Sequence, residues 1–369
     1  MSQTSHARPP LYVFAGGGTG GHLAPGIAVA EQLRHDQPNC RIRFVGSGRP
    51  VERQMLEPTG FEFSACETLP LTALRRRPDR FLCSHWKAFQ EACSSIRADR
   101  PAAIIGLGGF ASVPFSIAAR RRGVPCILLE QNTVPGKANR WLSRWQPICL
   151  TFDESARYLP RKAVSHLTGN PLRADVCRIA AAGHELPFEK TNLLVLGGSL
   201  GSRQINDSVL TAVEQCATEL TDWKIIHQTG PEGADDARSL YSRLEIAHDV
   251  APFFADLPSR LAEATLAVAR AGATTLAELA AVGVPAVLVP YPTAADDHQT
   301  RNAQLFVETG AAAMVTSADG SFAPVDLVPT LKPLLADQPH LLNMSQAMKT
   351  LARPEAAKEV VAILHSLVN

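Results

Sequence analysis

Glycine, threonine and glutamate follow one apolar run at a spacing that suits the binding of a phosphate and a sugar. The run 264–268 is expected to form a buried parallel strand, and Gly272, Thr274, Thr275 and Glu278 follow it at the start of a small-residue helix. The first N–H groups of a helix have no intrahelical partner, and the helix dipole favours an anion there. Glu278, one turn into the helix, is placed to accept hydrogen bonds from two adjacent sugar hydroxyls. Thr275 and Glu278 also fit a capping box, S/T-x-x-E, which needs no ligand.

A second glycine-rich turn, residues 16–21, follows the expected strand 11–15 and leads directly to His22. It contains the G-x-G-x-x-G fingerprint of dinucleotide-binding proteins, so a nicotinamide-dependent oxidoreductase is one interpretation. That fingerprint requires an acidic residue at the end of the second strand, and residues 44–48 contain none. His22 lies where the positive end of a helix favours a neutral imidazole, which suits a general base for a hydroxyl nucleophile. The alternative is a histidine that only hydrogen-bonds the glycine turn.

The sequence carries no signature of a required metal ion or cofactor. No G-x-x-x-x-G-K-[ST] occurs, which excludes a P-loop, and no D-x-D occurs; the only adjacent acidic pairs of this kind are at 235–236 and 296–297. We therefore expect no metal and no cofactor, with helix N-termini stabilising the phosphate charge instead. The eight cysteines are scattered without a C-x-x-C, a pattern typical of reduced thiols in a cytosolic protein.

These turns require parallel sheets whose strands alternate with helices. The expected strands are 11–15, 41–45, 61–65, 102–105, 126–129 and 148–152, then 192–196, 223–227, 248–250, 265–269, 286–289 and 312–315. Helices are expected between them, notably at 80–98 and 112–122. This alternation predicts an α/β fold of two doubly wound Rossmann-like domains with a cleft between them. We expect an N-terminal domain at 1–167, a linker at 166–173, a C-terminal domain at 168–350 and a closing helix at 351–369.

Composition and charge agree with two domains and an anionic partner. A chain of 369 residues is too long for one ordinary core. The net charge of +1 conceals a charge of +10 through residue 168 and −9 over the remainder. No nucleic-acid-binding motif occurs, so a membrane surface or a pyrophosphate fits the basic half better. No apolar run approaches the roughly 20 residues that span a bilayer, and the first ten residues lack the apolar region of a signal peptide.

One stretch, residues 71–89, combines large apolar residues with a basic cluster. Phe81, Leu82, Trp86 and Phe89 recur at helical spacing, and an arginine run at 75–77 precedes them. Such a stripe is usually core and such a run is usually solvated. The alternative is that this stretch contacts the membrane, because no other anchor is evident. The arginines would then lie beside anionic lipids and the aromatic residues in the headgroup region.

Seven short motifs occur in order along nearly the whole chain: GGTGGH (17–22), GLGGF (106–110), EQN (130–132), GNPLR (169–173), GGS (197–199), RAGATTLAE (270–278) and DHQ (297–299). Together they resemble the MurG family, the bacterial transferases that add N-acetylglucosamine to the lipid-linked muramyl-pentapeptide (lipid I), giving lipid II for peptidoglycan. The resemblance implies a GT-B fold. It also implies a metal-independent, inverting reaction in which the C4 hydroxyl of the muramyl sugar displaces UDP.

The resemblance also implies roles for individual residues. Thr19, Gly20 and Gly21 fall on the sugar-diphosphate side of the cleft, Asn132 and Gln299 on the transferred sugar, and Arg173 and Ser199 on nucleotide-binding positions. Phe254 falls on a uracil-contacting position, read through its backbone. The diphosphate and ribose positions are Ala273, Thr274, Thr275, Leu276, Ala277 and Glu278, with Glu278 on the ribose hydroxyls. His22 falls on the position of the general base.

We therefore expect an N-acetylglucosaminyltransferase whose partners are UDP-N-acetylglucosamine, lipid I and the anionic cytoplasmic membrane surface, with no nucleic acid. Such an enzyme would lie peripherally on the cytoplasmic side of the inner membrane. The alternatives are another GT-B enzyme, such as a glycolipid glycosyltransferase or a UDP-N-acetylglucosamine epimerase, and a nicotinamide-dependent oxidoreductase. A non-catalytic binding module is the least favoured alternative, because the chain combines two glycine turns with His22 and Glu278.

Overall fold

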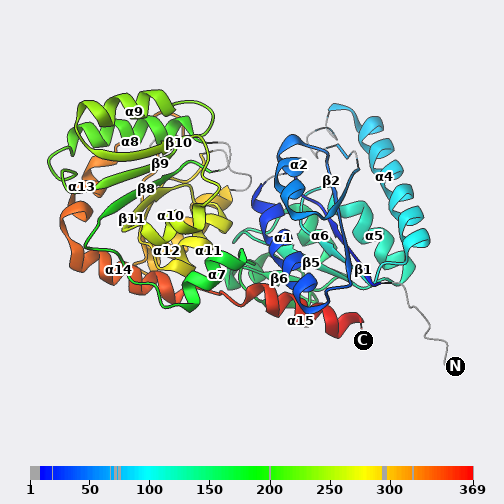
Figure 1. Ribbon diagram of the computed structural model, residues 1–369. Coiled ribbons are helices and arrows are strands. Elements are labelled where there is room, and N and C mark those ends of the chain that lie inside the picture. The colour runs from blue at the N-terminus through cyan, green and yellow to red at the C-terminus, as the bar shows by residue number, and fades with distance from the viewer. Residues whose placement is uncertain are drawn as a thin grey trace. The chain divides into compact units, whose positions relative to one another are not determined.

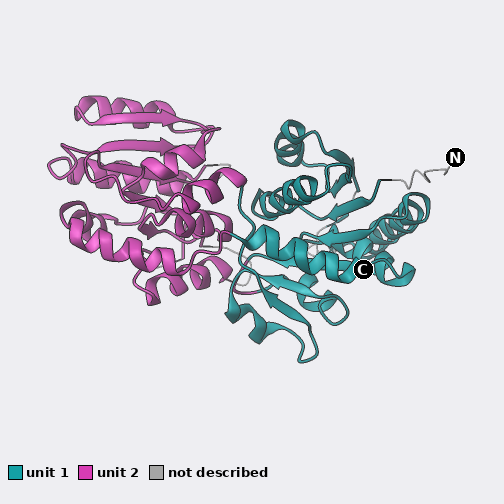
Figure 2. Cartoon of the chain, turned by 60° about the horizontal axis from the view of Figure 1, so that its bottom comes forward, with its two compact units in different colours: residues 1–131, 135–173, 355–369 teal, residues 132–134, 174–354 magenta. Residues whose placement is uncertain are grey.

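The structure is a computed structural model that describes residues 9–18, 20–66, 68–69, 73, 76–198, 201–292, 297–317 and 320–368. The chain divides into two compact units (Figure 2). Unit 1 comprises residues 1–131, 135–173 and 355–369, and unit 2 comprises residues 132–134 and 174–354. The short segment 132–134 therefore belongs to unit 2 although the chain on both sides of it belongs to unit 1.

Unit 1 is built on a seven-stranded parallel sheet (Figure 1). In spatial order its strands are β3 (Glu62–Ala65), β2 (Arg41–Gly46), β1 (Leu11–Ala15), β4 (Ala103–Gly106), β5 (Cys126–Glu130), β6 (Ile148–Leu150) and β7 (Ser165–Leu167). β1 pairs with β2 and β4, and all of its residues are buried. Burial on both faces explains why this segment is a continuous apolar run rather than an alternating one.

Helices cover both faces of the unit 1 sheet. They are α1 (Gly20–Asp36), α2 (Pro50–Leu56), α4 (Pro78–Asp99), α5 (Ser112–Arg122), α6 (Lys137–Leu142) and α15 (Ala356–Val368), with two short 3-10 helices, η1 (Glu57–Thr59) and η2 (Asp153–Tyr158). Tyr12 and Phe14 of β1 pack in the core that α1 and α15 close. Leu11 and Val13 pack in the core that α4 and α5 close. The last helix of the chain thus completes the core of unit 1.

Unit 2 repeats the plan with a six-stranded parallel sheet. Its strands, in spatial order, are β10 (Ala247–Ala251), β9 (Lys224–Gln228), β8 (Asn192–Leu196), β11 (Leu266–Ala269), β12 (Ala286–Leu288) and β13 (Ala312–Met314). Its helices are α7 (Ala174–Ala181), α8 (Arg203–Gln215), α9 (Ala234–Arg243), α10 (Leu257–Glu263), α11 (Ala273–Val282), α12 (His298–Glu308), α13 (Val328–Ala336) and α14 (Gln338–Thr350). Leu193, Val195, Leu266 and Val268 of the central strands β8 and β11 lie in its main core.

The predicted fold class is confirmed, because both sheets are parallel and their strands alternate with helices. All twelve expected strands occur, with ends shifted by at most two residues. β7 was not predicted and occupies the start of the stretch expected as a linker. Its three residues lie at the sheet edge, exposed or half-buried, so they form no apolar run. Among the described residues, no helix is both long and apolar enough to cross a membrane.

Candidate functional site

The turn between β11 and α11 presents a helix N-terminus that lacks a side-chain cap. β11 ends at Ala269, and α11 begins at Ala273 with Gly272 as its N-cap residue. Glycine has no side chain that accepts hydrogen bonds from the first helical N–H groups, and such a helix end has the positive potential that binds phosphate. Thr275 is the third residue of α11 rather than its N-cap, so the capping-box alternative for Thr275 and Glu278 is wrong.

Arg270 places a buried positive charge immediately before this turn. The side chain is 7% exposed, and its Nη1 donates to Oε1 of Gln204 at 2.9 Å and to the carbonyls of Val289 and Pro290, both at 3.1 Å. Its Nη2 donates to Oγ of Ser202 at 2.7 Å. All of these acceptors are neutral, and no carboxylate among the described residues forms an ion pair with Arg270.

Burial lowers the pKa of the Arg270 guanidinium to about 10, so the side chain remains charged at neutral pH. A buried charge without a counter-ion is costly unless something anionic compensates it. Together with the uncapped start of α11, Arg270 makes this turn a strongly positive region of unit 2.

The glycine turn between β8 and α8, also in unit 2, contacts Arg270, which precedes the turn between β11 and α11. Ser202 is the N-cap residue of α8, where its Oγ accepts from the Ile205 N–H at 3.3 Å while also accepting from Arg270. Gly201 has a φ of +74°, and a Cβ there would lie 2.3 Å from the carbonyl oxygen of Thr229. Only glycine fits this close approach. Ser199, the expected nucleotide-binding residue of this turn, lies outside the described residues.

Three other expected donor-site residues of unit 2 are buried or already engaged. Glu278 of α11 is 6% exposed. Oε1 of Gln299 accepts from the N–H of Tyr291 at 2.9 Å, and Oδ1 of Asn132 accepts from Nδ2 of Asn302 at 3.3 Å. Because Asn302 also donates to the carbonyl of Ala271 at 3.1 Å, α12, the segment 132–134 and the β11–α11 turn are tied together within unit 2.

Phe254, expected to read uracil through its backbone, has its N–H engaged within the chain. That N–H donates to Oε1 of Gln228 at 3.0 Å, while Nε2 of Gln228 donates to the carbonyl of Gly198 at 3.3 Å. The side-chain amide of Gln228 thus offers one acceptor and one donor, as the edge of a uracil ring does. A base that used the Phe254 N–H would have to displace Gln228.

The glycine turn of unit 1 is held by a buried carboxylate. Glu52, from the first turn of α2, is fully buried, and its Oε1 accepts from the N–H of Gly18 at 2.6 Å and from the N–H of Ser47 at 3.0 Å. Its Oε2 accepts from the N–H of Arg49 at 2.9 Å, and Nη1 of Arg49 donates to the Gly18 carbonyl at 2.9 Å. A Cβ at Gly17 would lie 2.7 Å from Oε1, so this position also needs glycine.

Glu52 lies six residues after the end of β2, and it is committed to the glycine turn. The described end of β2 therefore has no carboxylate available for a ribose, as the sequence indicated. This arrangement argues against a nicotinamide-dependent oxidoreductase.

His22 lies in the first turn of α1, half-buried beside the turn after β4. Gly108 in that turn has a φ of +91°, and a Cβ there would come 3.0 Å from Cδ2 of His22 and 3.6 Å from Nδ2 of Asn139. Asn139 is itself fixed, because its Nδ2 donates to the carbonyl of Leu129 and to Oε2 of Glu130, both at 2.9 Å. The motifs at 17–22, 106–110 and 130–132 therefore meet around His22.

The expected site residues that the structure describes are divided between the two units. His22, Gly20, Gly21 and Arg173 belong to unit 1. The unit 2 group comprises Asn132, Phe254, Ala273, Thr274, Thr275, Leu276, Ala277, Glu278 and Gln299. Thr19 lies outside the described residues, as does Ser199. Among the described residues, no group of three or more His, Cys, Asp or Glu side chains could hold a metal ion.

Sequence reasoning assigned no role to three supporting residues: Glu52, Arg270 and Asn302. Arg270 directly precedes the glycine turn, and a charge beside an expected phosphate site was a usable signal. Glu52 and Asn302 had no such signal, because each acts on segments that are distant in the sequence.

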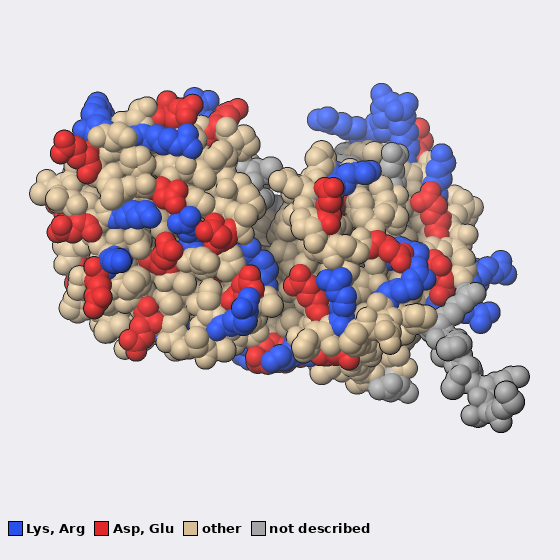
Figure 3. Space-filling view, in the orientation of Figure 1, with Lys and Arg blue, Asp and Glu red and all other residues tan. Residues whose placement is uncertain are grey.

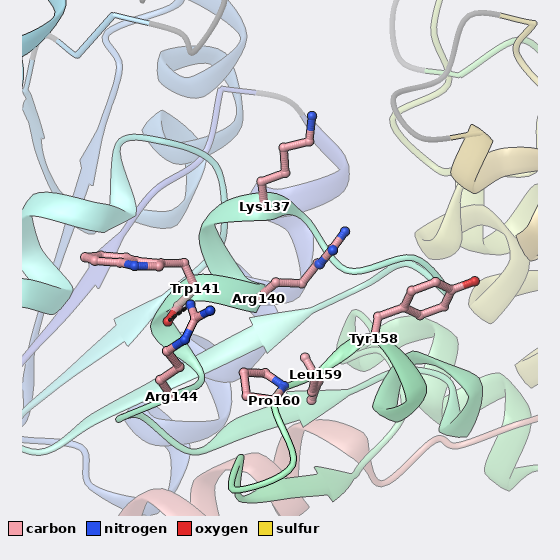
Figure 4. A pocket seen from close by; sticks show the side chains of 7 residues that line it. All are labelled: Lys137, Arg140, Trp141, Arg144, Tyr158, Leu159 and Pro160. Atoms are coloured by element: carbon pink, nitrogen blue, oxygen red, sulfur yellow. Dashed lines mark hydrogen bonds between the residues drawn. The ribbon is translucent and has the colours of Figure 1, made fainter.

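A surface pocket of about 380 Å³ lies between α6 and the chain after η2 in unit 1 (Figure 4). Lys137, Arg140, Trp141 and Arg144 line one side of it, and the segment 158–160 lines the other. Among the described residues, no carboxylate forms an ion pair with these three cations. The pocket therefore combines net positive charge with exposed aromatic surface.

Aromatic and cationic side chains connect this pocket to α5 and α4. Trp141 and Trp145 are 41% and 42% exposed and pack edge to face at 4.9 Å, and Arg120 of α5 lies over Trp145 at 4.8 Å. The neighbouring Arg121 lies over Phe89 of α4 at 5.1 Å. Figure 3 shows Lys and Arg side chains gathered over the N-terminal end of α4, whereas unit 2 shows both signs intermixed on that face.

Comparison with known proteins identifies the class. Residues 12–147 match the glycosyltransferase family 28 N-terminal domain, and residues 192–360 match the glycosyltransferase family 28 C-terminal domain.

A relative from Syntrophotalea carbinolica is 37% identical over 363 residues, covering 96% of this chain and 98% of its own; its name is UDP-N-acetylglucosamine--N-acetylmuramyl-(pentapeptide) pyrophosphoryl-undecaprenol N-acetylglucosamine transferase. The crystal structure of Acinetobacter baumannii MurG is similar, with a TM-score of 0.77 and 27% identity over 97% of this chain and all of that one. The chain belongs to this family of transferases, the MurG family. A putative UDP-N-acetylglucosamine 2-epimerase from Listeria monocytogenes has a TM-score of 0.65 at 15% identity, covering 98% and 96% of the two chains, which shows a shared fold alone.

Proposed function

We propose that this protein transfers N-acetylglucosamine from UDP-N-acetylglucosamine to lipid I, giving lipid II and UDP. It is a hexosyltransferase of peptidoglycan synthesis. Full-length similarity to the MurG family is the observation that carries this conclusion, since it covers both units and all seven motifs. The epimerase alternative rests on the fold alone and is not favoured.

We assign the donor to unit 2. The uncapped start of α11 and the charge of Arg270 favour a diphosphate at the turn between β11 and α11. In this assignment the diphosphate binds at the start of α11 through the N–H groups of Ala273, Thr274 and Thr275, which precede the first intrahelical hydrogen bond, from Leu276 to Gly272; Glu278 accepts from the ribose hydroxyls. Because these groups already supply positive potential where UDP leaves, the reaction needs no metal ion.

We assign the acceptor and the general base to unit 1. His22 takes the proton of the C4 hydroxyl of the muramyl sugar, and the oxygen attacks the anomeric carbon of N-acetylglucosamine. The bond from that carbon to the diphosphate breaks, UDP leaves as an anion, and the configuration inverts. Asn139 and Gly108 hold the surroundings of His22 in place.

The test is an assay of the protein with UDP-N-acetylglucosamine and lipid I in detergent, in excess EDTA, with lipid II and UDP as the measured products. The proposal expects both products in equal amounts. Hydrolysis or epimerisation of the sugar nucleotide without lipid II would overturn it. Activity that disappears in EDTA and returns with magnesium would contradict the metal-free mechanism.

Glu278→Ala tests the donor assignment. The proposal expects weaker UDP binding by about 1.5–3 kcal/mol, because the ribose hydroxyls lose a charged acceptor. Isothermal titration calorimetry with UDP measures this. A lower melting temperature with unchanged UDP affinity would mean that Glu278 only supports the fold.

We also propose that the protein lies peripherally on the cytoplasmic face of the inner membrane and contacts it through α4, α5 and α6. Leu82 and Trp86 of α4 are 63% and 58% exposed, whereas Ala88 and Ala92 on the same helix are buried in the core. The core contacts of α4 are thus made by other residues, and Leu82 and Trp86 are not needed for them. With the cations around Trp141, which form no ion pair among the residues that the structure describes, these two side chains suit an anionic headgroup region.

Sedimentation with anionic vesicles tests this proposal. Binding should fall when Arg75, Arg76, Arg77 and Arg80 become Ser, and it should weaken with added salt. A matched variant in which four exposed arginines of unit 2, Arg178, Arg203, Arg238 and Arg243, become Ser should bind vesicles normally. Equal binding by the wild-type protein and the α4 variant would contradict the proposal.

A further inference from the structure

Asn302 is a fully buried side chain that joins three segments of unit 2. It lies in α12, one helical turn after Gln299. Its Oδ1 accepts from the N–H of Thr133 at 3.0 Å and from the hydroxyl of Thr133 at 2.9 Å. Its Nδ2 donates to the carbonyl of Ala271 at 3.1 Å and to Oδ1 of Asn132 at 3.3 Å. Two acceptor and two donor positions of the carboxamide are therefore all used.

The partners fix the orientation of this amide. The N–H of Thr133 can only donate, so the Asn302 atom that faces it is the oxygen. The carbonyl of Ala271 can only accept, so the atom that faces it is the nitrogen. The Asn132 atom within reach of that nitrogen must then be its own oxygen, and the NH2 of Asn132 points away from Asn302.

We propose that Asn302 is a positioning residue for the transferred sugar. It fixes Asn132 with its NH2 directed to a sugar oxygen, either a hydroxyl or the acetamide carbonyl, and it holds the segment 132–134 beside the donor turn at Ala271. This inference rests on the proposed function, because it takes Asn132 to contact the transferred sugar. Asn302 is itself buried and acts through Asn132 and Thr133.

Two variants separate this role from a merely structural one when UDP and UDP-N-acetylglucosamine are titrated calorimetrically. Asn302→Ala removes all four hydrogen bonds. Asn302→Asp keeps the acceptor for Thr133 but sets an oxygen against the oxygens of Ala271 and Asn132, so that the Asn132 amide is driven to turn over. For both variants we expect UDP affinity within about twofold of the wild-type value. Affinity for UDP-N-acetylglucosamine should fall about tenfold or more, because the sugar loses an oriented donor.

Asn206 offers a matched control, because it is a buried asparagine of unit 2 with comparable hydrogen bonds. Its Nδ2 donates to the carbonyl of Thr229 at 3.0 Å, and its Oδ1 lies 3.2 Å from Nε2 of His227. Asn206→Ala should lower the melting temperature but leave the ratio of the two affinities unchanged.

Asn132→Ala and the double variant with Asn302→Ala complete the test. If Asn302 acts through Asn132, the double variant loses no more sugar-dependent affinity than Asn132→Ala alone. If Asn132→Ala leaves the ratio unchanged, the sugar assignment within the proposed function fails, and this inference fails with it. If Asn132→Ala lowers the ratio but neither Asn302 variant does, only this inference is overturned. An Asn302 variant that weakens both ligands equally also overturns it. Should Asn302→Ala not fold, Asn302→Asp decides between these results.

Discussion

The two units place a glycine turn between a strand and a helix in the same way, but the buried charged side chain at the turn is a carboxylate in unit 1 and a guanidinium in unit 2. In unit 1 the carboxylate of Glu52 accepts from the N–H of Gly18. In unit 2 the guanidinium of Arg270 donates to Ser202 and to the carbonyls that follow β12. The carboxylate of Glu52 occupies the Gly18 amide, which a phosphate would need, while the exposed guanidinium of Arg49 donates to the carbonyl of the same glycine. The guanidinium of Arg270, beside the turn between β11 and α11, attracts an anion.

In the proposed function, this difference lets one repeated architecture serve two substrates. A G-x-G-x-x-G turn does not by itself make a phosphate site, because the side chain that packs against it decides the sign of its potential. We have accordingly assigned the diphosphate of the donor to unit 2 and the hydroxyl nucleophile, beside His22, to unit 1. The following changes would break or sharpen this division.

The largest expected effect is that of His22→Ala in unit 1. Turnover should fall by about 10²–10⁴, because the acceptor hydroxyl loses its base. Affinity for UDP-N-acetylglucosamine should be kept, since we assign the donor site to unit 2. Steady-state kinetics and calorimetry measure the two effects, with His35→Ala at the exposed end of α1 as the control. Near-normal turnover would leave His22 as a residue that only supports the turn.

Arg270→Met should lower both the stability and the UDP affinity of unit 2, and leave unit 1 unchanged. Losing several charged hydrogen bonds should lower the free energy of unfolding by about 2–4 kcal/mol, and UDP affinity should fall about tenfold or more. Denaturant titration and calorimetry give the two values. Arg243→Met, which removes an exposed arginine paired with Glu214, should change neither. Unchanged UDP affinity for Arg270→Met would remove the charge argument for a donor site in unit 2.

Glu52→Gln should destabilise unit 1 without lowering the affinity for the donor. The amide NH2 would face a backbone N–H, so the free energy of unfolding should fall by about 1–3 kcal/mol for each donor left without a partner. UDP affinity should stay at its wild-type value. The exposed Glu57→Gln nearby is the control for charge. A Glu52→Gln protein with wild-type stability would show that the carboxylate does not hold the turn.

The smallest expected effect is the pH dependence that His227 gives to the stability of unit 2. Burial lowers the pKa of His227 to about 3. Tyr241 lies 2.8 Å from its Nδ1 and Asn206 lies 3.2 Å from its Nε2. The unfolded chain takes up a proton below about pH 6.5 and the folded chain does not, so stability is lost as the pH falls from about 6.5 towards 3. Denaturant titration should show a loss of about 2 kcal/mol at pH 5 from this residue. A His227→Gln variant should lack this part of the pH dependence, and a variant with the full wild-type dependence would assign it to other groups.

The sequence was sufficient for the architecture because every central strand is an apolar run bounded by glycine or helical segments. β1 and β8 were predicted to the residue. β7 was not, because a three-residue edge strand buries too little to leave a hydrophobic pattern. The glycine turns after β1 and β8 were also visible, because Gly16, Gly17, Gly18, Gly198 and Gly201 have positive φ angles, which favour glycine.

The residues that decide what those turns bind were less visible. Glu52 acts on Gly18 across 34 residues, and Asn302 acts on Thr133 across 169 residues. Such pairs depend on which segments the fold brings together, and no local pattern encodes that. The capping-box alternative at Thr275 failed for a related reason: the helix begins at Ala273, and only its hydrogen bonds reveal that start.

Amide hydrogen exchange with UDP tests most directly the claim that the donor diphosphate belongs to unit 2. The account predicts slower exchange at the start of α11, residues 273–276, when UDP is added. Exchange at residues 16–18 of unit 1 should not change, because Glu52 already holds the Gly18 amide. Protection of the unit 1 turn by UDP, with no change at the start of α11, would contradict the account.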